Sequence, residues 1–249
     1  MQIQTITIVG QGNVATHYYQ IMKEKGLSVK MVSSHLPFHK EDFLSDLVIL
    51  AVKDDVLESV VLNIKQCILT ELNHNQILVH TSGYVETSIL KPIAEVYGSF
   101  YPLQSLKKGM SVDFNTVPLC TWANTEEAKQ ELEDLALKLS SIHHTLTDEQ
   151  RKTIHLAAVF VNNFPNHLFH IAQTILEKDN LSLDILFPLI DRTVTAIKEK
   201  DPKLCQTGPA FRHEEKIMQQ HLDKLSTSEQ QIYKLLSASI MKTKQDETK

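Results

Sequence analysis

The feature that most constrains the fold is the stretch VGQGNVA, residues 9–15, which follows an apolar run and precedes a helical pattern. In a dinucleotide-binding turn, the first glycine permits a tight turn, the second lets the backbone approach a pyrophosphate, and the third position packs a helix against a strand. Gly10, Gly12 and Ala15 take these positions. The helix that follows would direct its N-terminal N–H groups at the phosphates. An ordinary tight turn is the alternative interpretation.

Short apolar strands alternate with helical segments over the first 146 residues. Strands this apolar are typical of a parallel sheet that is covered on both faces by crossover helices. We therefore predict an α/β fold, with a Rossmann-like, mostly parallel sheet as a dinucleotide-binding domain at residues 1–146. The expected strands are 5–9, 28–33, 47–52, 76–80, 98–101, 117–122 and 142–145, and the expected helices are 13–25, 55–66, 86–95 and 126–139.

The strand pattern ends after Thr145, and a capping box formed by Thr147 and Gln150 opens a helical segment. We predict an all-α domain for substrate binding and dimerisation at residues 147–249. Because no low-complexity linker separates the two domains, we expect them to pack closely and to form a ligand cleft. The expected helices are 148–178, 182–200, 209–224 and 227–242.

Composition narrows the class of partner. The formal charge of −5 supplies no basic field for a nucleic acid. No apolar stretch approaches the roughly 20 residues that a membrane span needs, and the first residues show no signal-peptide pattern. We expect a cytoplasmic protein with a small-molecule substrate that binds neither nucleic acid nor membrane. The isolated positions of Cys67, Cys120 and Cys205 predict neither disulfides nor a metal site.

The second expected strand ends in Ser33, Ser34 and His35, where an NAD-specific site would place a carboxylate on the ribose 2′-hydroxyl. No acidic side chain here would repel a 2′-phosphate, and Lys40 follows nearby. We therefore predict NADP as the cofactor, with NAD and a reduced deazaflavin as open alternatives. The other residues expected to bind the cofactor are Gly10, Gln11, Gly12, Asn13, Val14, Ala51, Val52, Lys53, Thr81 and Ser82.

Polar segments follow two further strands and would reach the same sheet edge, because ligands bind outside the carboxyl ends of parallel strands. These segments are HTSG at 80–83, for which a capped turn is the alternative, and YPLQS at 101–105. The residues expected to contact the substrate there are Ser82, Gly83, Tyr101, Gln104 and Ser105.

Arg212 falls in the first turn of an expected helix, where the helix dipole disfavours a cation. We expect it to hold an anion such as a substrate carboxylate, together with Thr207. A surface salt bridge is the alternative.

The helix expected over residues 151–170 carries polar side chains on an apolar background. At 100° per residue, His155, Asn162 and Asn166 fall within about 20° of one line. Such a line must be satisfied by hydrogen-bond partners, either in a core or in a ligand cleft. Pro165 removes one helical hydrogen bond and predicts a kink.

These motifs make the chain resemble a bacterial family of oxidoreductases that joins a Rossmann-like domain to a helical domain of unassigned function. That family is akin to pyrroline-5-carboxylate reductase and to 6-phosphogluconate and 3-hydroxyacid dehydrogenases. The resemblance reaches about residue 240 and rests on GQGNVA, LVILAVKDD, HTSG, YPLQSL, HLAAVFVNNFPNH and QTGPAFRHE. It implies NAD(P)-linked redox activity, a 6-phosphogluconate-dehydrogenase-like C-terminal domain and a homodimer formed through that domain.

The chain departs from related dehydrogenases, which carry a helix lysine followed by an asparagine as the catalytic pair. Here the residues on one face are His155 and Asn162. We predict that His155 donates a proton, because its ordinary pKa lies near neutrality, and that Asn162 orients the substrate. The predicted reaction is hydride transfer to or from a small carboxylate-bearing carbonyl or imine compound. The alternatives are a nucleotide sensor without turnover and a scaffold with a relict glycine turn.

Overall fold

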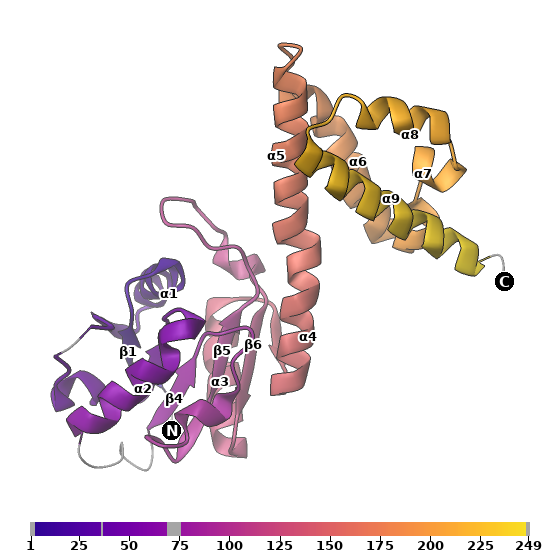
Figure 1. Cartoon of the computed structure of the whole chain (residues 1–249). Coiled ribbons are helices and arrows are strands. Elements are labelled where there is room, and N and C mark those ends of the chain that lie inside the picture. Colours follow the sequence, from indigo (N-terminus) through magenta and orange to yellow (C-terminus); the bar gives the residue numbers. More distant parts are fainter. Residues whose placement is uncertain (1–2, 36, 69–75, 248–249) are drawn as a thin grey trace. The chain divides into compact units, whose positions relative to one another are not determined.

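A computed structural model describes residues 3–35, 37–68 and 76–247 of the chain (Figure 1). The chain divides into two compact units, Met1–Asn162 and Asn163–Lys249, and each is described by itself. The first unit includes the helix that follows the sheet. The division into functional domains after residue 146, and a cleft between them, therefore stay predictions.

A seven-stranded sheet in the order β2-β1-β3-β4-β5-β6-β7 forms the centre of the first unit. Strands β1 to β5 are parallel, β6 is antiparallel to β5, and β7 is parallel to β6. This arrangement confirms the predicted Rossmann-like, mostly parallel sheet. The strands are β1 (Thr5–Val9), β2 (Ser28–Val32), β3 (Leu47–Leu50), β4 (Ile77–His80), β5 (Val96–Pro102), β6 (Leu119–Ala123) and β7 (His143–Thr145).

Apolar side chains alternate between the two faces of the sheet and create two cores. In β3, Leu47 and Ile49 join one buried cluster, whereas Val48 and Leu50 join the other. This alternation follows from the two-residue period of a strand, and burial on both faces explains the continuous apolar run. The α-helices of this unit are α1 (Asn13–Glu24), α2 (Asp54–Ile68), α3 (Glu126–Leu139) and α4 (Asp148–Ala158).

The prediction of an α-helix over residues 86–95 is wrong. The structure has only a 3₁₀ turn there, η2 (Thr87–Leu90). Pro92 explains the difference, because it has no N–H group with which to continue an α-helix and it restricts the residue before it. Two more 3₁₀ turns lie in this unit, η1 (Lys40–Phe43) and η3 (Phe114–Thr116).

The described part of the second unit contains helices joined by turns and no strand, which confirms the predicted all-α region. None of the helices in the described ranges is both long enough and apolar enough to cross a membrane. The elements are α5 (Phe164–Glu177), η5 (Leu183–Leu186), α6 (Phe187–Glu199), η6 (Pro202–Cys205), α7 (Pro209–Arg212), α8 (Glu215–Leu222) and α9 (Thr227–Glu247).

Two of the long helices predicted from the sequence are interrupted. A π turn at Val159–Asn163, η4, separates α4 from α5, and it lies where the lack of an N–H group at Pro165 predicts a disturbance. The helix predicted over residues 209–224 is split because His213 adopts a left-handed conformation with φ of 58°, which ends α7.

Candidate functional site

The candidate residues of five separate segments lie along one edge of the sheet. Because β1 to β5 run parallel, their carboxyl ends lie side by side, and the loops that follow them share this edge. In spatial order from β2 to β5, the segments are 33–35, 10–13, 51–53, 81–83 and 103–105.

The fold itself requires a glycine at position 10. Its φ of 125° is one that other residues rarely adopt, and a Cβ atom placed there would lie 2.3 Å from the carbonyl oxygen of Ala51. The backbone N–H of Gly10 donates to the carbonyl of Val32 at 2.9 Å, so the turn also joins β1 to the end of β2. This glycine therefore allows the ends of β1, β2 and β3 to pack closely together beside the glycine turn.

Gly12 is not required by the protein. Its φ of −75° suits any residue, and a Cβ atom placed there would meet no atom within 4 Å. Gly12 is also the N-cap of α1, yet it supplies no side-chain cap, and the first turn of α1 has no acidic residue. The result is an open cradle in front of uncapped backbone N–H groups, which fits a phosphate.

The segment after β2 offers hydroxyl groups and an imidazole. Ser33 Oγ accepts a hydrogen bond from the backbone N–H of His35 at 3.1 Å, which holds this corner together. Ser33 and Ser34 are partly buried, and His35 is exposed. Position 33–35 thus contains no carboxylate that would repel a 2′-phosphate.

Tyr101 and His155 form a hydrogen-bonded pair at the β4 and β5 end of the same edge. The hydroxyl oxygen of Tyr101 lies 3.0 Å from Nδ1 of His155, and the two rings meet at 70°. Gly83 makes this approach possible, because a Cβ atom at that position would lie 2.4 Å from Nδ1 of His155. Burial, assisted by nearby Cys120, raises the pKa of Tyr101 to about 12, so the phenol stays protonated and donates to Nδ1.

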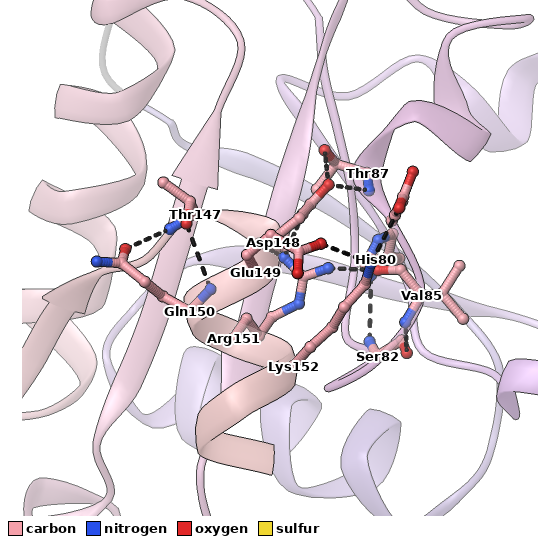
Figure 2. Close-up of polar contacts among 12 residues, drawn as sticks. His80, Ser82, Val85, Thr87, Thr147, Asp148, Glu149, Gln150, Arg151 and Lys152 are labelled. Carbon is pink, nitrogen blue, oxygen red and sulfur yellow. Dashed lines mark hydrogen bonds and ion pairs between the residues drawn. The ribbon is translucent and has the colours of Figure 1, made fainter. Parts of the chain in front are cut away.

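Arg151 anchors the helix that carries His155 (Figure 2). Its side chain has no exposure to solvent. The guanidinium donates to Asp148 Oδ1 at 2.7 Å, to Ser99 Oγ at 3.0 Å and to the carbonyl oxygen of Val85. Arg151 thereby ties α4 to β5 and to the segment between β4 and η2.

Asp148 completes this anchor from the first turn of α4. Its Oδ2 accepts hydrogen bonds from the backbone N–H of Thr87 at 2.9 Å and from the Thr87 hydroxyl at 3.0 Å. Burial alone would raise the pKa of Asp148, but the hydrogen bonds from Thr87 and the charge of Arg151 lower it overall. Lys152, on the exposed side, pairs with Glu86 and Glu149 at 2.9 Å each (Figure 2).

His80 is fully buried beside Arg151 at the end of β4. Its Nδ1 accepts a hydrogen bond from the backbone N–H of Ser82 at 3.2 Å, so the neutral ring carries its proton at Nε2 (Figure 2). Within the described ranges, that Nε2 and the Nε of Arg151 have no hydrogen-bond partner. Burial, together with the charge of Arg151, lowers the pKa of His80 to about 4.

Among the described residues, no hydrogen bond joins Asn162, Gln104 or Ser105 to Tyr101 or His155. Asn162 is exposed, and the wider π turn between it and His155 changes the angular spacing that a uniform α-helix would give. Gln104 and Ser105 are exposed, and Gln104 Oε1 accepts a hydrogen bond from the backbone N–H of Ser105 at 2.8 Å.

Arg212 and Thr207 belong to the second unit. Arg212 forms two hydrogen bonds with Glu214, at 2.8 and 3.0 Å, and it ends the short helix α7. The structure thus shows the surface salt bridge that was the alternative for Arg212, and a role in holding a substrate carboxylate stays a prediction.

Sequence reasoning missed the anchor of Arg151 and Asp148, and it gave no role to His80. Arginine side chains are rarely fully buried, so an arginine in a sequence is normally assigned to the surface. The available signal was the spacing of Asp148 and Arg151, three residues apart at a helix start. Among the described residues, no group of three or more His, Cys, Asp or Glu side chains is arranged to hold a metal ion.

Comparison with known proteins places the chain in a family. Residues 117–240 match a family described as a domain of unknown function, DUF2520. The solved structure of a Bacteroides fragilis protein, provisionally named an NADP oxidoreductase, is 30% identical with a TM-score of 0.83, and the alignment covers 96% of this chain and 98% of that one. The chain belongs to the same family as this Bacteroides protein. The family resemblance identified from the sequence motifs is confirmed.

More distant structures share the fold across both parts of the chain. A Thermotoga maritima protein is 18% identical, with a TM-score of 0.68 over 98% of this chain and 100% of that one. An imine reductase from Myxococcus stipitatus, solved in complex with NADP+, is 12% identical, with a TM-score of 0.64 over 97% and 93%. None of the curated proteins compared with the sequence matches it.

Replacement of Arg151 by methionine should destabilise the protein by about 3 kcal/mol, because one partner of a buried ion pair is lost and Ser99 and Val85 lose their donor. Lys152→Met is the matched control, since it removes a partly exposed cation from the next position, whose partners Glu86 and Glu149 are exposed, and it should change stability little. Urea unfolding followed by circular dichroism measures both. Equal stability of the two variants would contradict the anchoring role of Arg151.

The buried, neutral His80 should make stability depend on pH. Its folded pKa of about 4 lies below the unfolded value of 6.5, so the unfolded state binds the proton more readily, and stability that is complete above pH 6.5 falls as the pH drops towards 4. The difference between the two pKa values corresponds to a decrease of about 3 kcal/mol in the free energy of unfolding. His80→Asn should flatten this dependence in urea titrations at pH 7 and 4.5. His144→Asn, at an exposed position, should leave it unchanged, and a similar slope in all three proteins would exclude His80 as its source.

Proposed function

We propose that the protein is an NADP-dependent oxidoreductase that transfers a hydride to or from a small carboxylate-bearing carbonyl or imine compound. The observation that carries this proposal is the sharing of one sheet edge by the open cradle at Gly12 and the hydrogen-bonded pair of Tyr101 and His155. The first suits a phosphate, and the second suits a proton transfer. When bound, the nicotinamide cofactor would supply or accept the hydride.

The cofactor would extend along the edge from β2 to β4. Ser33, Ser34 and His35 would hold the 2′-phosphate. The absence of a carboxylate in segment 33–35 supports NADP over NAD, and so do the Bacteroides relative, named for NADP, and the imine reductase solved with NADP+. The remaining proposed contacts are Gly10, Gln11, Gly12, Asn13, Val14, Ala51, Val52, Lys53, Thr81 and Ser82.

The spacing of the strands suits this assignment. From β1, which carries the glycine turn, to β4, which leads to Gly83, there are two strand-to-strand steps, or about 10 Å. The pyrophosphate at Gly12 would therefore leave the nicotinamide close to Ser82 and Gly83, beside His155. Tyr101, Gln104 and Ser105 would then shape the substrate side of the pocket.

His155 would handle the proton. Hydride addition to a carbonyl or imine carbon moves an electron pair onto oxygen or nitrogen, and that atom must take a proton. In the protonated ring, the Nε2 proton would pass to the substrate and leave a neutral ring whose Nδ1 accepts a hydrogen bond from the Tyr101 hydroxyl. His155 is partly exposed and would recover its proton from solvent. Asn162 would orient the carbonyl or imine group.

A nucleotide-binding sensor without turnover is the second candidate function. The observation that favours it is the double hydrogen bond between Arg212 and Glu214, because a substrate carboxylate would have to displace Glu214 before Arg212 and Thr207 could hold it. An enzyme would need this exchange, whereas a sensor would not.

We also propose that residues 147–249 act as the substrate-binding and dimerisation domain of a homodimer. Several large apolar side chains on the helices of the second unit are exposed to solvent. Ile185 and Leu189 are each 64% exposed, and Leu204 is 77% exposed. Such a concentration of apolar surface is typical of a protein interface.

His155→Asn should lower kcat for NADPH oxidation by about 100-fold or more, because a general acid is lost, while the affinity for NADP+ stays unchanged. The assay would test small 2-oxo carboxylates and cyclic imino carboxylates, and the exposed His144→Asn is the control that should keep full activity. An unchanged kcat in His155→Asn would contradict the proton-donor role. NADPH binding by the native protein without turnover of any compound would favour the sensor.

In sedimentation velocity, the native protein should be a dimer and Leu189→Asp should shift it to a monomer, because a charge would be buried in the interface. Leu137→Asp, on α3 of the first unit, introduces the same charge at a comparably exposed leucine and should leave the dimer intact. A monomeric native protein would refute the proposed dimer.

A further inference from the structure

A segment that follows β5 lies across the first turns of α1. We call residues 103–113 the phosphate strap. The backbone N–H of Lys108 donates to Asn13 Oδ1 at 3.2 Å, and a ring nitrogen of His17 lies 3.3 Å from the carbonyl oxygen of Met110. Leu106 is buried in the core and fixes the strap to the sheet. The strap is thus attached to α1 at two points, next to the glycine turn.

A tight turn at the tip of the strap carries two lysines. The backbone N–H of Met110 donates to the carbonyl of Lys107 at 3.1 Å, and Gly109, with φ of 82°, takes the position where a type II turn needs glycine. Lys107 and Lys108 are both exposed. Over the described ranges, neither side chain makes a hydrogen bond or an ion pair within the protein.

The start of α1 lacks the features with which proteins usually compensate a helix N-terminus. No side chain caps it, and no acidic residue occupies its first turn. A Cβ atom at Gly12 would meet open space, so the glycine that adjoins this end is explained by neither backbone conformation nor packing. A helix end without a cap, open space at Gly12 and two ammonium groups without partners in the described ranges all suit the binding of an anion.

We propose that Lys107 and Lys108 bind the pyrophosphate of the dinucleotide beside the glycine turn. This inference rests on the proposed function and adds to it two residues that determine affinity. Lysine suits the role because its compact charge on a flexible stem can follow a phosphate without a fixed geometry. Each ammonium–phosphate contact is a charge-assisted hydrogen bond.

The position at which the strap is attached indicates that the two lysines would bind the pyrophosphate and not the 2′-phosphate. Its backbone contact is with Asn13, the first residue of α1, whereas the 2′-phosphate would be held by residues 33–35 after β2. Loss of the two lysines should therefore weaken NADP+ and NAD+ by the same factor. It should also reduce the dependence of the affinity on salt, since fewer charge pairs remain to be screened.

Isothermal titration calorimetry on the full chain, with NADP+ and NAD+ as separate probes, tests the proposal. We expect the variant Lys107→Ala/Lys108→Ala to bind each dinucleotide about tenfold or more weakly than the native protein. The control is Lys65→Ala/Lys91→Ala, which removes the same charge from exposed sites where the chain returns to the amino ends of β4 and β5.

The outcomes separate the strap from the proposed function. If Lys107→Ala/Lys108→Ala binds as tightly as the native protein, the proposed role of the two lysines is wrong. The same holds if the control variant loses as much affinity. In both cases the proposed NADP dependence is unaffected. A loss confined to NADP+ overturns the pyrophosphate assignment. If the native protein binds neither dinucleotide, the proposed function fails, and the strap fails with it.

Discussion

Arg151 has no contact with solvent, so its charge must be compensated entirely inside the protein. Asp148 supplies the counter-charge, and Ser99 and the carbonyl of Val85 accept further hydrogen bonds. A charge in this environment fixes geometry, because any shift of the helix would leave it without partners. His155 lies one turn further along α4, so its position over Gly83 and beside Tyr101 depends on this anchor.

The two glycines of the turn illustrate how packing and ligand binding can be separated. Gly10 has a φ of 125° and meets the backbone of Ala51, so the convergence of β1 and β3 explains it. Gly12 has neither constraint, and the space in front of it opens onto a helix end without a cap. The same short motif therefore contains one glycine that the fold needs and one whose lack of a side chain leaves room for a ligand.

Much of the first unit could be predicted because its signals are local. Continuous apolar runs such as 47–52 specify strands that are buried on both faces, and their alternation with helices specifies a parallel sheet. The predictions that failed depend on events at single residues. Pro92 reduces a helix to a 3₁₀ turn, and the left-handed His213 splits the helix predicted over residues 209–224. The anchor was missed because burial of an arginine depends on partners that lie 52 and 66 residues away in sequence.

The proposed NADP site runs along one sheet edge, with the pyrophosphate at Gly12 and the nicotinamide at the pair of Tyr101 and His155. A crystal structure of the chain grown with NADP+ tests it most directly. We expect continuous density along this edge, with the 2′-phosphate at Ser33–His35 and the nicotinamide ring beside Gly83. A dinucleotide bound elsewhere, or an edge that stays empty at saturating NADP+, would contradict it.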